Sequence, residues 1–142
     1  MKQGIKIAIV IVIILIVAIV AVSAFSFTSE DSSNELKLNT TDNFTKAQEI
    51  ASQQNKSVLL VLSSDTCHWC DQLKKDTLND SRVIEKLDQK YVTAIVNVDK
   101  QPDIAKTFNA VGTPIVMLFD NNGTQKARID GYCGPEELME YL

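Results

Sequence analysis

The sequence has little of what marks several large functional classes. Its 142 residues hold one histidine, three cysteines and three prolines, and no sustained internal period that would indicate repeats or a coiled coil. Neither a Gly-x-Gly-x-x-Gly run nor a P-loop occurs, so no nucleotide cofactor is predicted. After residue 27 the chain carries 12 basic and 18 acidic side chains. This acidic balance argues against a nucleic-acid partner, because phosphates need a basic surface.

One long apolar run stands near the N-terminus. No charged residue occurs from Ile7 to Phe27, and no polar residue from Ile7 to Val22. As a helix, about 21 residues span roughly 31 Å, which matches the hydrocarbon core of a bilayer. The run is longer than the about 7–15 residues typical of a signal peptide, although Ala21–Ala24 offers small residues for cleavage. We therefore expect residues 1–27 to form a transmembrane anchor, with a cleaved signal segment as the alternative.

The charges beside this run predict its orientation. Lys2 and Lys6 precede it, and Glu30 and Asp31 follow it, which favours a cytoplasmic N-terminus. The sequence thus predicts a single-pass protein of the cell membrane whose C-terminal domain lies on the extracytoplasmic side. Residues 28–34 are polar and predict a flexible tether to that domain.

Asn-x-Ser/Thr sequons are more frequent than expected. Composition predicts roughly one or two, whereas five occur, and they indicate either a glycoprotein or local use of Asn, Ser and Thr in turns and caps. The sequons begin at Asn39, Asn43, Asn55, Asn79 and Asn122.

Beyond the tether, strand and helix patterns alternate. Strands are expected over residues 35–39, 57–63, 91–98, 115–119 and 124–131, and helices over 42–54, 67–78, 81–87, 103–108 and 136–142. The strand over 57–63 is apolar on both faces, which is typical of a buried central strand. A turn at Asn121-Asn122-Gly123 joins the last two strands as a hairpin. The order predicts an α/β fold with a mixed sheet and helices on both faces.

The strongest chemical signal is Cys67-His68-Trp69-Cys70, between a buried strand and a helix start. At this spacing two sulfurs reach disulfide distance with little strain. Cys67 faces the free N–H groups and positive dipole end of the helix, which favours its thiolate. Cys67 is therefore predicted to attack substrate disulfides and Cys70 to resolve the mixed disulfide. His68 would raise oxidising power by adding positive charge, and Asp65 opposes this effect.

Two other interpretations of the cysteine pair stay open. A zinc or copper site needs more ligands, and beyond the pair the chain offers only Cys133 and the single histidine inside the motif. An inert disulfide across one turn would close a very small loop and stabilise little. No resident metal is expected.

Several segments together resemble the thioredoxin-like fold family over about residues 35–142. They are the strand Val58–Leu62 before the cysteines, Val96–Asp99, Pro102, Val111–Pro114 with its following strand, and Gly131–Tyr132. The helix break between Asp76 and Leu87 is most similar to the C-terminal reducing domain of membrane thiol–disulfide interchange proteins and related membrane-anchored proteins. The resemblance implies that Pro114 follows a cis peptide bond facing the sulfurs, and that the Thr113 backbone pairs with a substrate chain.

The sequence departs from thioredoxins proper beside the cysteines. Val61 and Ile95 stand where the family has a buried acid and a lysine, so the usual proton relay is absent or replaced. His68 and Trp69 stand where thioredoxins have Gly-Pro. These departures leave the redox potential, and with it the reducing or oxidising direction, open.

Two residues near the motif have alternative interpretations. Trp69 is expected at the rim, where it shapes the substrate surface, rather than in the core. Cys133 follows Gly131, which by the resemblance borders the active site, and is either a small buried core residue or a third redox thiol. Its Cα should lie roughly 10–12 Å from that of Cys67, too far for a direct disulfide.

The combined hypothesis is a membrane-anchored, extracytoplasmic oxidoreductase that exchanges disulfides with protein thiols through Cys67 and Cys70. A reducing role requires a membrane partner that delivers electrons, since no cofactor motif occurs in the sequence. The alternative is a thioredoxin-fold metal chaperone or binding module without redox turnover.

Overall fold

A five-stranded mixed sheet lies at the centre of residues 36–142, the part of the chain that the computed structural model describes. The strand order is β1-β3-β2-β4-β5. The strands are β1 (Thr40–Thr41), β2 (Ser57–Ser63), β3 (Tyr91–Asn97), β4 (Ile115–Phe119) and β5 (Gln125–Asp130). β1 and β2 each run parallel to β3, whereas β4 is antiparallel to β2 and to β5. The predicted α/β architecture with a mixed sheet is confirmed.

The predicted anchor and tether, residues 1–27 and 28–34, lie outside the described residues. Between residues 36 and 142, none of the helices has the length and apolar character that a membrane span requires.

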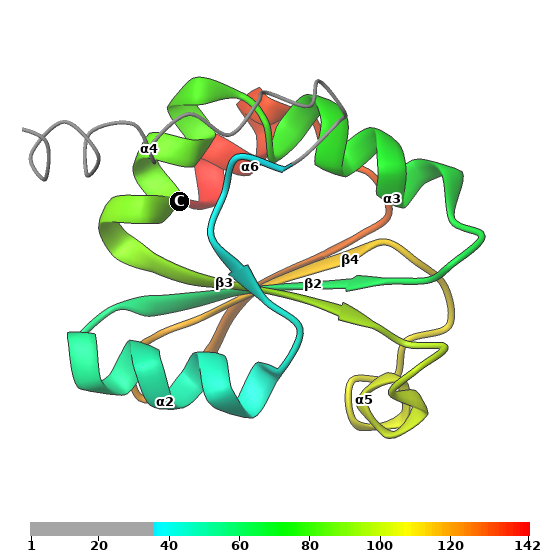
Figure 1. Ribbon diagram of the computed structural model, residues 1–142, viewed down its shortest axis with the longest axis horizontal. Coiled ribbons are helices and arrows are strands. Elements are labelled where there is room, and N and C mark those ends of the chain that lie inside the picture. The colour runs from blue at the N-terminus through cyan, green and yellow to red at the C-terminus, as the bar shows by residue number, and fades with distance from the viewer. Residues whose placement is uncertain (1–35) are drawn as a thin grey trace, which may run out of the picture. The chain divides into compact units, whose positions relative to one another are not determined.

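Helices cover both faces of the sheet, as Figure 1 shows. One face carries α2 (Phe44–Gln54) and α5 (Pro102–Thr107), and the other carries α3 (His68–Gln72), α4 (Ser81–Lys90) and α6 (Pro135–Tyr141). A short π-helix, η1 (Leu73–Thr77), directly continues α3. The segment that follows β2 is therefore helical almost without interruption until it reaches β3.

The core consists of two apolar clusters, one on each face of the sheet, and β2 contributes to both. Leu59 and Val61 pack in the cluster that also contains the buried residues of α4 and α6. Val58, Leu60 and Leu62 pack in the cluster that contains those of α2. All five side chains are at most 1% exposed. The prediction of a central strand apolar on both faces is confirmed.

The first strand lies elsewhere than predicted. The alternation over residues 35–39 indicates an edge strand, but the paired residues are Thr40 and Thr41, opposite Thr93 and Ala94. Leu38 is instead buried in the core cluster on the α4 and α6 face. Burying a leucine is worth about 1.5–3 kcal/mol, whereas two alternating leucines are too short a pattern to define a strand.

The helix predicted over residues 67–78 begins one residue later and changes type. Cys67 has an extended backbone and acts as the N-cap, so α3 begins at His68. The Leu78 N–H donates to the Leu73 carbonyl at 2.9 Å, the five-residue spacing of a π-helix. The predicted fresh start at residues 79–81 is present, because Asp80 caps α4.

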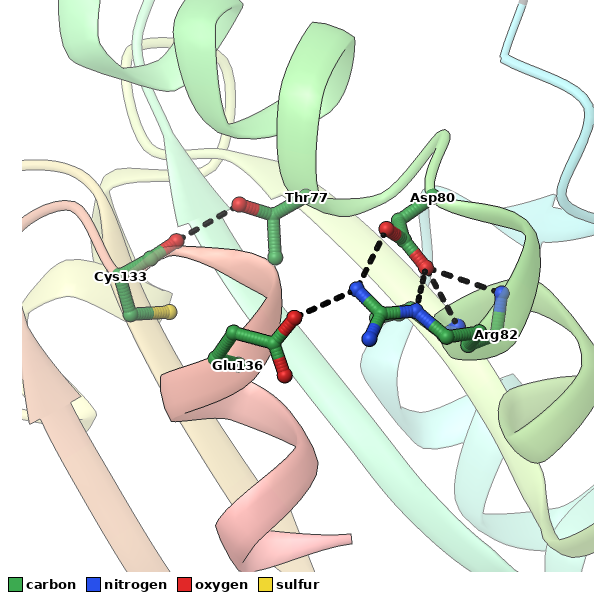
Figure 2. Close-up of polar contacts among 6 residues, drawn as sticks. Thr77, Asp80, Arg82, Cys133 and Glu136 are labelled. Atoms are coloured by element: carbon green, nitrogen blue, oxygen red, sulfur yellow. Dashed lines mark hydrogen bonds and ion pairs between the residues drawn. The ribbon is translucent and has the colours of Figure 1, made fainter.

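A polar network connects this helical segment to α6 (Figure 2). The Asp80 carboxylate accepts hydrogen bonds from the backbone N–H groups of Arg82 and Val83. The Arg82 guanidinium lies 3.0 Å from Asp80 and 2.7 Å from Glu136. The Thr77 hydroxyl donates to the Cys133 carbonyl at 2.7 Å. The loop before α6 is thereby held against the end of η1.

Acidification should weaken this network. The hydrogen bond from the Arg82 side chain holds the pKa of Asp80 below its ordinary value of 3.8. A carboxylate with a lowered folded-state pKa stabilises the fold above its unfolded pKa, and this contribution is lost as the pH falls through the folded pKa.

We expect Asp80→Asn, which keeps the capping oxygen, to lower the free energy of unfolding at pH 7. The difference from wild type should shrink as the pH is lowered below 3.8, the ordinary pKa of this carboxyl group. Urea titrations at pH 7 and at a series of acidic pH values measure this, and a difference independent of pH would contradict it.

Candidate functional site

The two cysteines of the motif form a disulfide at the end of the segment that leaves β2. Their Cα atoms are 5.2 Å apart. Cys67 is half-buried, whereas Cys70 is 1% exposed. The more exposed residue of the pair is therefore the one predicted to attack substrate.

The start of α3 accounts for the different surroundings of these sulfurs. The Cys67 Sγ atom accepts a hydrogen bond from the Cys70 backbone N–H at 3.1 Å. A hydrogen bond donated to sulfur at a helix start stabilises the thiolate relative to the thiol. Cys70 lies inside α3, whereas Cys67 is its N-cap residue. This geometry supports Cys67 as the attacking thiol.

The loop that contains Thr113 and Pro114 is joined to the cysteine segment. The hydroxyls of Ser64 and Thr113 lie 2.9 Å apart and share a hydrogen bond. The Thr113–Pro114 peptide bond is cis, as the resemblance implies. Pro114 is buried and Thr113 is half-buried. On the far side of the loop, the Gly131 N–H donates to the Pro114 carbonyl at 2.8 Å.

His68 and Trp69 both lie on the surface between the cysteines. His68 is exposed, and Trp69 is 57% exposed, so the indole occupies the rim rather than the core. The His68 and Trp69 rings meet edge-on with centroids 5.6 Å apart. Both residues are thus available at the surface to a substrate that approaches the disulfide.

Asp65 is engaged by neighbouring loops. Its carboxylate accepts a hydrogen bond from the Asn97 side-chain amide at 2.6 Å. Its backbone N–H donates to the Asp99 carboxylate at 2.7 Å. These contacts fix the chain between β2 and the cysteines to the end of β3.

Val61 and Ile95 face each other across the paired strands β2 and β3. Val61 belongs to the core cluster on the cysteine-helix side, and Ile95 packs against the same cluster. The departure seen in the sequence therefore places two apolar side chains side by side where thioredoxins proper have a polar pair.

Cys133 is a free thiol with no solvent exposure. Burial raises the pKa of this thiol to about 11, and the nearby Glu137 carboxylate adds to the rise. At neutral pH the sulfur is therefore protonated and packed among apolar side chains.

The sequence interpretation missed three residues as parts of this site. Tyr132 packs against Trp69, with ring centroids 5.7 Å apart. Ser64 forms the link to Thr113, and Val111, two residues before Thr113, is fully exposed. Val111 and Tyr132 lie inside segments that carry the family resemblance, and Ser64 lies between two such segments, but their residue types alone did not mark them as site residues. Among residues 36–142, no cluster of three His, Cys, Asp or Glu side chains is arranged to hold a metal ion.

Comparison with known proteins identifies the family. The thioredoxin-like domain family matches residues 44–142. The chain belongs to this family. Similar curated proteins are the thiol:disulfide interchange proteins DsbD of Actinobacillus pleuropneumoniae and Haemophilus ducreyi. The first is 28% identical over 116 residues, which cover 78% of this chain and 20% of that protein. The second is 30% identical over 100 residues, which cover 67% and 18%. The chain thus spans about a fifth of the length of these relatives.

Solved structures show the same fold. A thioredoxin from Thermus thermophilus has a TM-score of 0.65 and 23% identity, and the match covers 73% of this chain and 83% of that one. The oxidised C-terminal domain of Neisseria meningitidis DsbD has a TM-score of 0.60 and 19% identity, with 72% and 96% covered. The resemblance read from the sequence is confirmed. Family and paired cysteines together support thiol–disulfide oxidoreductase activity for this domain.

Alkylation of the reduced protein should separate the three thiols. We expect Cys67 to react first and to titrate below about pH 7.5, because the Cys70 N–H and the helix start stabilise its thiolate. Cys133 serves as the internal control and should stay unlabelled at neutral pH until the protein is unfolded. Mass spectrometry after timed iodoacetamide pulses measures each site. Faster labelling of Cys70 than of Cys67 would reverse the assigned roles.

Proposed function

We propose that this chain is a membrane-anchored thiol–disulfide oxidoreductase that exchanges disulfides with protein substrates through Cys67 and Cys70. The single observation that carries the proposal is the disulfide between a half-buried N-cap cysteine and a buried cysteine three residues later. Family membership and the similarity to proteins named for thiol:disulfide interchange support it.

In the reducing direction the Cys67 thiolate attacks one sulfur of a substrate disulfide. The substrate S–S bond breaks, a Cys67–substrate mixed disulfide forms, and the other substrate sulfur leaves as a thiolate that takes up a proton. The Cys70 thiol then loses its proton and attacks the Cys67 sulfur. This step breaks the mixed disulfide, releases the second substrate thiol and forms the Cys67–Cys70 disulfide. Two electrons pass to the substrate in each cycle.

The residues around the disulfide have separate roles in this proposal. The Thr113 backbone, beside Pro114, pairs with the substrate chain and holds its cysteine over Cys67. Trp69 provides the adjoining surface. His68 and Asp65 adjust the charge near the attacking sulfur and so the redox potential.

Continued reduction requires that the Cys67–Cys70 disulfide be reduced again. We propose that a membrane protein with reactive thiols supplies these two electrons and is itself oxidised to a disulfide. The same chemistry in reverse oxidises substrate thiols, and the relative potentials of the partners set its direction.

The membrane location is part of the proposal. Residues 1–27 provide an uncharged run long enough to span a bilayer, with the basic residues Lys2 and Lys6 at its start. In this arrangement the N-terminus is cytoplasmic, residues 28–34 form the tether, and residues 35–142 form the catalytic domain outside the membrane.

Substitution of the resolving cysteine should trap substrates. Cys70→Ser leaves the attacking thiol but removes the group that breaks the mixed disulfide, so Cys67-linked proteins should accumulate. Non-reducing gels of acid-quenched cells measure these adducts. Cys67→Ser is the matched control and should form none. Adducts through neither cysteine, together with a metal ion held stoichiometrically by the reduced wild-type protein, would favour the metal-chaperone function.

Fractionation tests the anchor. The full chain should remain in the membrane pellet after alkaline carbonate washing, because about 21 apolar residues in a bilayer resist extraction. A chain lacking residues 1–28 should move to the soluble fraction. Protease added to spheroplasts, which keep the cytoplasmic membrane but lack the outer envelope, should digest the domain. Carbonate release of the full chain would contradict the anchor, and full protease resistance in spheroplasts, with digestion after lysis, would contradict the orientation.

A further inference from the structure

We propose that Tyr132 is a positioning residue that holds the Trp69 indole beside the disulfide, so that a polypeptide substrate docks on it. The proposal rests on the proposed function. It concerns substrate docking, not bond exchange, and it predicts a preference for substrates with an apolar side chain near the reactive cysteine.

The place of Trp69 makes the orientation of its ring important. The residue immediately precedes Cys70 and is 57% exposed, so its backbone is fixed by the helix while most of its side chain is in water. An exposed aromatic ring contributes more affinity for a partner when it is held in place before binding, because ordering it on binding costs conformational entropy. Among residues 36–142, the rings of His68 and Tyr132 contact the indole.

The two contacts differ in how firmly the contacting ring is held. His68 is exposed and adjacent to Trp69 in the sequence, so it constrains the indole only locally. Tyr132 comes from the loop between β5 and α6, is half-buried and packs against the core cluster. Its ring lies 5.7 Å from the indole, centroid to centroid, at an interplanar angle of 47°. This separation is within the range of favourable aromatic pairs.

The residues on both sides of Tyr132 are fixed to the active-site segments. Before it, the Gly131 N–H donates to the Pro114 carbonyl. After it, the Cys133 carbonyl accepts a hydrogen bond from the Thr77 hydroxyl (Figure 2). The Cys133 side chain is fully buried. Tyr132 is therefore held between the proline loop and the helical segment that contains the cysteines. Contact with the Tyr132 ring can therefore restrict the motion of the indole.

The position of the indole matters only for substrates large enough to reach it. A polypeptide disulfide brings neighbouring side chains over the rim, where an apolar group can pack on Trp69. A small aromatic disulfide such as dithionitrobenzoate reaches the sulfurs without a chain to dock. Loss of the Tyr132 ring should therefore raise the KM for polypeptides and spare the reaction of the small disulfide.

The experiment compares Tyr132→Leu with Tyr132→Phe in the full chain in detergent. Trp69 is the single tryptophan, so the emission of the protein reports this ring alone. Tyr132→Leu should make the emission more accessible to acrylamide and raise the KM for insulin reduction by about 2- to 10-fold, the equivalent of one aromatic pair. Its kcat and its rate with dithionitrobenzoate should match wild type. Tyr132→Phe keeps the ring and should restore both the emission and the KM.

Tyr141→Leu is the matched control, because it removes an exposed tyrosine from α6 and should leave the emission and the KM unchanged. Wild-type emission and KM in Tyr132→Leu would overturn the proposal. Equal slowing with insulin and dithionitrobenzoate would also overturn it, because that result indicates damage to the sulfur chemistry. If wild type neither reduces insulin nor oxidises the thiols of a reduced polypeptide, the proposed function fails, and the emission comparison alone decides whether Tyr132 positions Trp69.

A measurement on the unchanged protein covers the case in which Tyr132→Leu does not fold. Nuclear Overhauser contacts between the Trp69 indole and Tyr132 ring protons are expected in the full chain. Their absence from an assigned spectrum overturns the proposal.

Discussion

The burial of β2 on both faces is the constraint on which the rest of the structure depends. Five consecutive side chains, residues 58–62, are almost completely removed from water and divide between the two core clusters. Each such side chain contributes about 1.5–3 kcal/mol relative to an exposed one. Because the side chains of a strand alternate between faces, a shift by one residue would exchange the two sets and mismatch both helical layers. The position of the C-terminal end of β2 is therefore fixed, and the cysteine motif begins four residues later.

After the end of β2, hydrogen bonds between loops hold the segments of the site together. Asn97, the last residue of β3, and Asp99, two residues later, hydrogen-bond to Asp65 in the segment leading to the cysteines, and Ser64 in the same segment bonds to Thr113. These contacts join residues more than 30 positions apart in the sequence. These hydrogen bonds lie near the C-terminal ends of the parallel inner strands β2 and β3. The apolar core determines where the strands end, and the polar loops determine how the active-site segments meet.

Cys67 and Cys133 show how the surroundings of a thiol set its chemistry. Cys67 accepts a backbone hydrogen bond at a helix start, which favours the thiolate. Cys133 is buried among apolar side chains, which raises its pKa to about 11. Its packing contributes to the core, and its carbonyl accepts the Thr77 hydroxyl, so the residue connects the loop before α6 to η1. The same thiol group thus packs in the core at Cys133, whereas at Cys67 it has the surroundings that the proposed exchange needs.

The sequence alone determined the order of strands and helices, the central place of β2 and the pairing of Cys67 with Cys70, because these depend on local patterns of apolar residues and on close spacing. It misplaced the first strand, where two alternating leucines are a weak signal and tertiary packing draws Leu38 into the core. It left Cys133 between two interpretations, because burial is a property of the assembled fold. The contact of Tyr132 with Trp69 joins positions 63 residues apart, so only the tertiary structure could bring it about.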